Sequence, residues 1–223
     1  MPRSVAWLLA ITLAATWAVV TPPVADARPE PDPIVFVHGY SGGESNWSTM
    51  VKRFEAAGWD ADRLVVWPYN WNQRNVTTAR QLADEIARVR DVTGAEQVTL
   101  ITHSMGGLSS RYYLSQLGGT EFVGTWVSLG GPNHGTNWAY GCWSPSCFDM
   151  RPGSALLAQL NDGPDPTPGP TEYATYWSRC DAVISPSDST VLPGADNTHV
   201  GCVGHLELLW DRTTFDLVLD RVR

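Results

Sequence analysis

The sequence is poor in positive charge. Its 223 residues include 15 lysines and arginines against 23 aspartates and glutamates, the formal net charge is −8, and Lys52 is the only lysine. No cluster of basic residues occurs, which argues against nucleic acid or an anionic membrane surface as the main partner. Hydrophobic residues make up 43% of the chain and charged residues 17%, which excludes global disorder. The length suits one domain with a sizeable core and is too short for two.

The sequence also lacks long apolar runs beyond its N-terminus. The run at 5–20 follows Arg3 and precedes Ala25-Asp26-Ala27. This order predicts a secretory signal peptide at 1–27, with cleavage after Ala27. An N-terminal membrane anchor is the alternative, but the run is shorter than the roughly 20 residues that a spanning helix needs. We therefore expect a secreted protein without stable membrane insertion, whose single domain covers 28–223.

Cysteine is scarce but even in number. The four residues are Cys142, Cys147, Cys180 and Cys202. In an exported chain they predict two disulfides, for which the count alone allows three connectivities. A zinc site is the weaker interpretation, because the spacing is not C-x-x-C and no histidine lies near the first pair. The sequence predicts no metal site and no cofactor, and leaves a calcium ion held by scattered aspartates as an open alternative.

Strand-like and helix-like segments alternate from residue 34 onward. The strand-like segments are 34–37, 64–66, 98–102, 122–129, 173–177 and a last one near 198–203. The helix-like segments are 45–57, the stretch 79–89 that Gly94 closes, 106–117, 154–160 and the C-terminus from about 213. This alternation predicts a parallel sheet covered by helices. Ligands bind such sheets at the carboxyl ends of the strands, so the loops there are expected to carry the chemistry.

One of these loops contains a candidate nucleophile. The strand 98–102 runs into His103-Ser104-Met105-Gly106-Gly107 and then into a helix. A strand, a tight turn and a helix form the context of a nucleophile elbow, which predicts Ser104 as the nucleophile. Thr102 stands where the G-x-S-x-G pattern has its first glycine. The alternative is a serine that merely caps a helix.

A serine nucleophile needs a base, and the base needs a carboxylate that orients it. In this architecture the chain order is serine, acid, histidine, which leaves His199 and His205 as candidate bases. His205 directly follows the last predicted strand and is preferred. Asp181 closely follows the strand 173–177 and is preferred over Asp188 as the acid.

The cysteines lie beside these two residues. Cys180 precedes Asp181, and Cys202 lies three residues before His205. If the two neighbouring strands end there, Cys180 and Cys202 can pair and join the acid loop to the base loop. Cys142 would then pair locally with Cys147.

An oxyanion hole requires two backbone N–H groups near the nucleophile. The residue after the nucleophile, Met105, supplies one. The loop after the first strand supplies the other, which predicts the amide of Tyr40.

Four sequence blocks resemble the small secreted bacterial lipases of the Bacillus lipase A type. They are Val37-His38-Gly39-Tyr40-Ser41-Gly42-Gly43, Thr102-His103-Ser104-Met105-Gly106-Gly107, Leu129-Gly130-Gly131-Pro132-Asn133 and Cys202-Val203-Gly204-His205-Leu206-Glu207-Leu208-Leu209. The resemblance implies a minimal α/β-hydrolase with a mostly parallel six-stranded sheet, helices on both faces and no dedicated lid. It also implies hydrolysis of carboxylic esters, including triacylglycerols, and assigns the same nucleophile, acid, base and oxyanion residues. Tyr40 departs from the small aliphatic residue of that family, and 137–170 looks longer than its counterpart.

The expected function is that of a secreted serine ester hydrolase, monomeric and without a cofactor, that acts on an ester or lipid substrate. An acyltransferase or a polyester hydrolase with the same residues is an alternative. A non-catalytic module that holds lipid or sugar through exposed tryptophans is another.

The eleven tryptophans are unusually many. Two fall in the predicted signal peptide, and three, Trp59, Trp126 and Trp210, suit core or helix packing. The other six lie on or beside loops at the expected catalytic edge, and we predict that some of them line an apolar approach to Ser104. These six are Trp47, Trp67, Trp71, Trp138, Trp143 and Trp177.

Overall fold

A six-stranded sheet organises the chain. The computed structural model describes Met1 and residues 30–223, and the predicted signal peptide lies outside the described residues apart from Met1. The strands are β1 (Ile34–Val37), β2 (Leu64–Val66), β3 (Val98–His103), β4 (Val123–Leu129), β5 (Glu172–Trp177) and β6 (Asp196–His199). Their order is β2-β1-β3-β4-β5-β6, and every neighbouring pair is parallel. The six-stranded sheet is confirmed, and it is parallel throughout.

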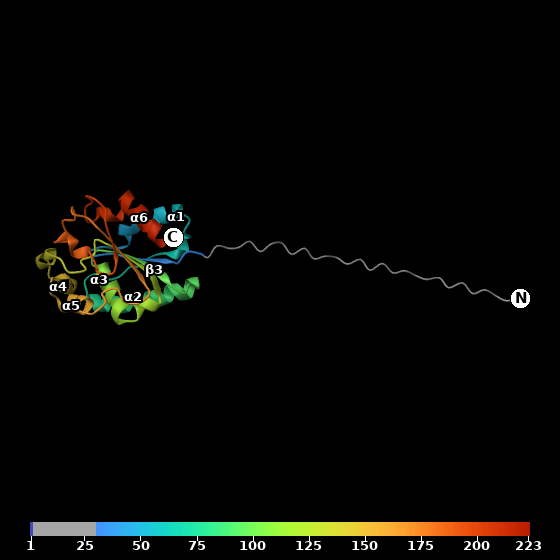
Figure 1. Ribbon diagram of the computed structural model, residues 1–223, viewed down its shortest axis with the longest axis horizontal. Coiled ribbons are helices and arrows are strands. Elements are labelled where there is room, and N and C mark those ends of the chain that lie inside the picture. Colours follow the sequence, from blue (N-terminus) through green and yellow to red (C-terminus); the bar gives the residue numbers. More distant parts are fainter. Residues whose placement is uncertain (2–29) are drawn as a thin grey trace. The chain divides into compact units, whose positions relative to one another are not determined.

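Helices cover both faces of the sheet, as predicted. They are α1 (Ser48–Ala56), α2 (Asn75–Thr93), α3 (Gly106–Gln116), α4 (Pro145–Met150), α5 (Ala155–Asn161) and α6 (Arg212–Val222). Figure 1 shows α1 and α6 on one side of the sheet and α2 and α3 on the other. The sequence explains this, because alternate residues of a strand point to opposite faces.

Strand β1, which lies between β2 and β3, illustrates the two cores. Ile34 and Phe36 pack with residues of α1 and α6, whereas Val35 and Val37 pack with residues of α2 and α3. All four side chains are fully buried. A continuous apolar run is therefore what a strand covered on both faces requires.

The last strand differs from its prediction. β6 is the polar segment Asp196–His199, whereas the apolar residues that suggested a strand at 198–203 lie mostly beyond it. The N–H of Val200 still donates to the carbonyl of Trp177 at 2.9 Å, but Gly201 then turns the chain with φ of 89°. Val200 and Val203 are buried in the α1/α6 core. Their hydrophobicity thus reflects a buried loop and not a strand.

A third apolar cluster lies beyond the carboxyl edge of the sheet, where α4 and α5 pack against the start of α3. It includes Met105, Leu108, Met150 and Leu157. Helix α4 is absent from the sequence prediction, although Ser144 caps it by accepting from the N–H of Cys147 and Pro145 occupies its first turn. Within residues 30–223, no helix is long and apolar enough to cross a membrane.

Candidate active site

A pocket of about 290 Å³ opens at the carboxyl edge of the sheet. The loops after β1, β3 and β5 and the segment after β6 all contribute to its wall. Its lining residues are Gly39, Tyr40, Ser41, Gly42, Asn46, His103, Ser104, Thr136, Trp138, Met150, Val183, Ile184, His205 and Leu206. The predicted nucleophile and the predicted base therefore face one cavity.

The turn between β3 and α3 exposes Ser104 to this pocket. Ser104 has φ of 53°, a left-handed conformation that costs a residue with a side chain on the order of 1–3 kcal/mol. Its N–H donates to the carbonyl of Leu129 at 2.9 Å, which ties the turn to the end of β4. A Cβ on Gly106 would lie 2.6 Å from the carbonyl oxygens of Val37 and His38. Only glycine therefore lets α3 start so close to β1.

Thr102 fits the position where the elbow pattern has glycine. Its side chain is fully buried, and its hydroxyl donates to the carbonyl of Val127 on β4 at 2.8 Å. Because this buried hydroxyl makes a hydrogen bond, its burial leaves no unsatisfied polar group to destabilise the fold. The departure from the pattern is thus accommodated locally.

The predicted acid and base are in direct contact. Nδ1 of His205 lies 2.7 Å from Oδ2 of Asp181, and both side chains are buried. The other oxygen, Oδ1, accepts from the N–H groups of Val183 and Ile184, each at 2.9 Å. The alternative acid Asp188 lies in a separate groove, and the alternative base His199 packs on Trp177. Of the candidates, Asp181 and His205 are the pair that the fold brings together.

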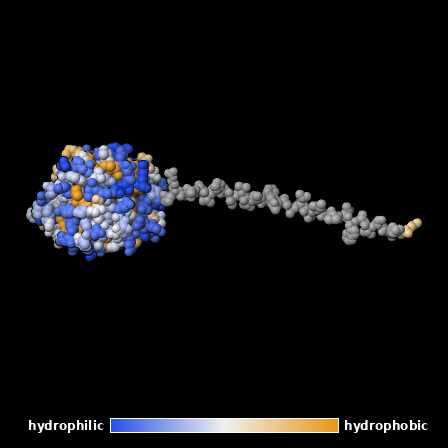
Figure 2. All heavy atoms as spheres, viewed as in Figure 1, coloured by the Kyte–Doolittle hydropathy of each residue, from blue (hydrophilic) through white to orange (hydrophobic). Residues whose placement is uncertain are grey.

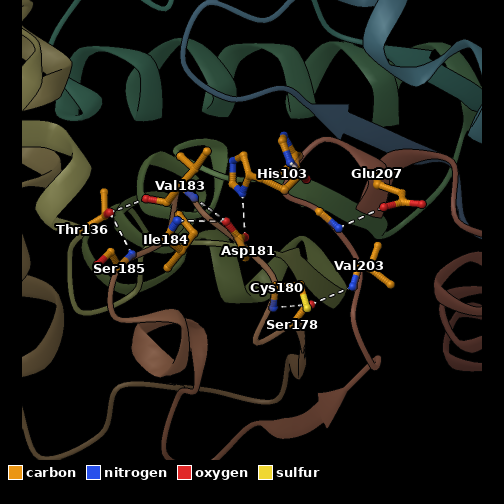
Figure 3. A network of polar contacts seen from close by, with 12 residues as sticks. His103, Thr136, Ser178, Cys180, Asp181, Val183, Ile184, Ser185, Val203 and Glu207 are labelled. Atoms are coloured by element: carbon orange, nitrogen blue, oxygen red, sulfur yellow. Dashed lines mark hydrogen bonds and ion pairs between the residues drawn. The ribbon is translucent and has the colours of Figure 1, made fainter.

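Thr136 holds the loop that follows Asp181. Its hydroxyl donates to the carbonyl of Val183 at 2.6 Å and accepts from the N–H of Ser185 at 3.1 Å. Figure 3 shows these contacts beside the two N–H groups that reach Asp181. The orientation of the Asp181 carboxylate is therefore fixed from two sides, by its own loop and by the segment before α4.

Both disulfides are present with the predicted pairing, Cys142–Cys147 and Cys180–Cys202. The second bond joins the loop of Asp181 to the segment that leads to His205. The hydroxyl of Ser178 makes a parallel link, because it accepts from the N–H of Cys180 at 3.1 Å and of Val203 at 2.8 Å (Figure 3). A covalent and a hydrogen-bonded connection thus join the same two loops.

The predicted oxyanion residues flank Ser104. Met105 follows it in the elbow, and Tyr40 belongs to the loop after β1. A Cβ on Gly39 would lie 2.6 Å from the Cβ of Ser104, so glycine lets this loop approach the nucleophile. Within residues 30–223, neither the N–H of Tyr40 nor that of Met105 donates to a protein acceptor.

Solved structures share this architecture. A mature lipase from Bacillus licheniformis superposes with a TM-score of 0.76 over 90% of this chain and 96% of that one, at 20% identity. An alpha/beta hydrolase from the metagenome of Mar Chica lagoon sediments in Morocco gives a TM-score of 0.61 over 86% and 90%, at 21% identity. The chain has the α/β-hydrolase fold.

Sequence comparisons find further similarities. Residues 35–143 match the family model described as lecithin:cholesterol acyltransferase. A triacylglycerol lipase from Burkholderia plantarii is 27% identical over 150 residues, which cover 61% of this chain and 41% of that lipase. The chain thus spans less than half the length of this curated relative.

Tyr69 supports the loop that carries Tyr40 and is absent from the sequence predictions. Its hydroxyl donates to the carbonyl of His38, and its ring stacks on the His38 imidazole with centroids 4.0 Å apart. His38 itself directly precedes Gly39 and Tyr40. One sequence feature could have indicated this role. Two aromatic residues, Trp67 and Tyr69, follow β2 at the same edge of the sheet.

We expect Tyr69→Phe to lower kcat for a soluble ester about fivefold with little change in KM, because a lost hydrogen bond of about 1 kcal/mol loosens the loop that carries Tyr40. Steady-state kinetics on a p-nitrophenyl ester checks this. The matched control is Tyr173→Phe, which removes a tyrosine hydroxyl that donates to the carbonyl of Pro168 on another part of the domain. Equal losses in both variants, or a loss confined to KM, would contradict a positioning role.

His103 is a buried neighbour of the predicted base. Its Nε2 lies 2.9 Å from the carbonyl oxygen of His205, and the two imidazole centroids are 4.6 Å apart. Burial lowers the pKa of His103 well below its ordinary value of 6.5, and the nearby His205 lowers it further. His103 therefore stays neutral and its Nε2–H donates to the backbone that carries the base.

This pKa predicts a loss of stability in acid. Below about pH 6.5 the unfolded chain takes up a proton that folded His103 does not, so stability falls by up to about 1.4 kcal/mol per pH unit for this group. We expect the melting temperature to drop between pH 7 and pH 5. The variant His103→Gln, which does not titrate, should show a smaller drop. An identical pH dependence in both proteins would show that His103 is not responsible.

The tryptophan predictions are confirmed in part. Trp138 lines the pocket, and Trp71 contacts the Tyr40 ring with centroids 4.7 Å apart. Trp47 and Trp67 are instead buried in the two cores, one on each face of the sheet. Trp210, assigned to packing from the sequence, is 47% exposed.

Proposed function

We propose that the chain is a secreted serine ester hydrolase, a lipase or an esterase, with Ser104, Asp181 and His205 as its catalytic triad. The observation that carries this proposal is the 2.7 Å contact of Asp181 with Nδ1 of His205, in a pocket that His205 shares with Ser104. A carboxylate bound to Nδ1 orients the imidazole and leaves Nε2 for the serine proton.

The proposed reaction begins when Oγ of Ser104 attacks the ester carbonyl while Nε2 of His205 takes the hydroxyl proton. Asp181 stabilises the imidazolium that forms. The amides of Tyr40 and Met105 stabilise the negative oxygen of the tetrahedral intermediate. His205 then gives its proton to the departing alcohol, and water hydrolyses the acyl-enzyme through the same groups.

The pocket favours an apolar group on the substrate. Its wall includes the large apolar side chains of Trp138, Met150, Ile184 and Leu206, together with the Tyr40 ring. Carboxylic esters with an apolar acyl or alkyl chain, such as acylglycerols, fit this chemistry. The names of the similar proteins, which include lipases, agree with it.

We also propose that 1–27 is removed on export. Four cysteines paired in two disulfides fit an oxidising compartment. N-terminal sequencing of protein recovered from culture medium should begin at Arg28, and a retained N-terminus would refute cleavage there.

The decisive test of the proposed function is covalent labelling. A fluorophosphonate probe should label the protein with one adduct, which peptide mapping places on Ser104, and the labelled protein should no longer hydrolyse a p-nitrophenyl ester. Absence of labelling, or labelling elsewhere, would refute the triad. A series of esters of increasing acyl length then defines the chain preference.

Acyl transfer is the second candidate, and the match to the acyltransferase family model favours it. The acyl-enzyme would pass its acyl group to an alcohol in place of water. Hydrolysis measured with and without an added alcohol acceptor, with analysis for the new ester, separates the two reactions. Polyester film in the same assay tests the remaining alternative.

A further inference from the structure

Four exposed aromatic side chains lie on the segment 138–148, which contributes Trp138 to the pocket wall. We call them the aromatic rim: Trp138 (42% exposed), Tyr140 (54%), Trp143 (77%) and Phe148 (41%). Trp138 belongs both to the rim and to the pocket wall, and Leu206, on the wall beside His205, is 54% exposed. In the view of Figure 2, hydrophobic residues form small, scattered spots on a mostly hydrophilic surface.

The rim is held outward by its own framework. The disulfide Cys142–Cys147 closes the segment that carries Trp143. Beneath the rings, the Arg151 guanidinium donates to the carbonyls of Ala139 and Cys142 at 3.1 and 2.9 Å.

The same guanidinium lies over three rings of the rim, 4.2 Å from the centroid of Phe148 and 5.4 Å from those of Tyr140 and Trp143. Its charge is therefore engaged by two carbonyls and three ring faces, which leaves it a weak attraction for anionic lipid. Cation–π contacts and a short covalent loop restrict the ways in which these rings can fold inward. The contacts within this segment therefore keep the aromatic rings of the rim exposed to solvent.

The rim also carries no charge of its own. The stretch 137–148 contains no acidic or basic residue in a chain with a net charge of −8. The next carboxylate, Asp149, is buried and paired with Arg74 at 2.9 Å. A surface of this kind neither attracts anionic lipid nor offers the charge pattern that orients a protein partner.

We propose that the aromatic rim docks the enzyme on an electrically neutral lipid surface and brings the mouth of the Ser104 pocket against it. Tryptophan and tyrosine favour the boundary between water and lipid, because their rings are apolar and their N–H and O–H groups stay hydrated. The proposal rests on the proposed function, since a lipid surface is useful only to a site that takes lipid esters. The shared residue Trp138 makes rim and pocket wall continuous.

The test separates docking from catalysis. Binding of the Ser104→Ala protein to vesicles of pure phosphatidylcholine is measured by co-sedimentation at low and high salt. Trp143→Ser and Phe148→Ser, each added to this protein, should weaken the partition coefficient about tenfold, because each removes apolar area from the contact. Val92→Ser is the matched control. Val92 is 71% exposed near the C-terminus of α2, which lies at the opposite edge of the sheet. This substitution should leave the partition coefficient unchanged.

The same rim substitutions with Ser104 intact should leave hydrolysis of a soluble short-chain ester unchanged. If wild-type protein fails to hydrolyse that ester, the proposed function fails, whatever the vesicles show. If the ester is hydrolysed but vesicle binding is absent, equal in the Trp143 and Val92 variants, or dependent on anionic lipid, the docking proposal is wrong. Self-association in analytical ultracentrifugation that Trp143→Ser abolishes would assign the rim to a second copy of the chain and overturn it as well.

Discussion

Ester hydrolysis should fall by a factor on the order of 10⁶ when Ser104 is replaced by alanine, because removal of a serine nucleophile abolishes the acyl-enzyme route. The fold should survive. Ser104 already has φ of 53°, its backbone N–H bond to Leu129 does not depend on the side chain, and its hydroxyl supports no other described residue. We expect an unchanged circular dichroism spectrum and a melting temperature within a few degrees of wild type.

Turnover of a p-nitrophenyl ester and thermal unfolding check this prediction. Ser115→Ala is a suitable control, because Ser115 lies on the same helix, α3, and its hydroxyl donates only to the carbonyl of Arg111 at 2.9 Å. The control should retain full activity. Substantial turnover by the Ser104 variant would assign the chemistry to another residue.

Asp181→Asn should lower kcat about 10⁴-fold without unfolding the protein. The amide oxygen can still accept from Val183 and Ile184, so the amide NH₂ group replaces Oδ2 and faces Nδ1 of His205. An NH₂ donor forces Nδ1 to act as the acceptor and moves the imidazole proton to Nε2. Nε2 then has no lone pair for the proton of Ser104.

The control for this variant is Asp188→Asn, which changes the other candidate acid in a separate groove. It should have near wild-type kcat, and both variants should melt near the wild-type temperature. A large loss in the Asp188 variant, with retained activity in the Asp181 variant, would reverse the assignment of the acid.

Much of the site geometry could be predicted because it depends on topology. Strand ends and chain order were enough to select Asp181 over Asp188 and to pair Cys180 with Cys202, since β5 and β6 are parallel neighbours. Any two loops that follow adjacent parallel strands emerge at one edge of the sheet. The contact of Asp181 with His205 follows from the same placement.

Features formed by polar residues could not be predicted from hydrophobic periodicity. β6 has the sequence Asp-Asn-Thr-His and is an edge strand, so hydrophobic periodicity does not mark it. Arg111 is only 2% exposed, and its guanidinium donates to the carbonyls of Asn133 and Leu160 at 3.2 and 2.9 Å. No pattern in the sequence distinguishes such an arginine from one on the surface of α3.

The contacts that support the candidate site could not be predicted from the sequence for a related reason. Tyr69 and Thr136 act through backbone carbonyls of residues far away in the chain, His38 and Val183. A backbone carbonyl leaves no signature in the amino-acid sequence, so its partner is visible only in the folded chain. The catalytic residue types could be inferred from chemistry, whereas the residues that hold them could not.

The order of the strands has a consequence for the time at which activity arises. Ser104 follows the central strand β3, but Asp181 and His205 follow β5 and the edge strand β6, close to the C-terminus. Ribosomes add about 5–20 residues per second, so the roughly 100 residues between Ser104 and His205 take on the order of 5–20 s to synthesise. Throughout that interval the growing chain carries its nucleophile without its base. On the proposed mechanism, the growing chain hydrolyses esters only after β5, β6 and the loops that follow them have been synthesised and have folded onto β3.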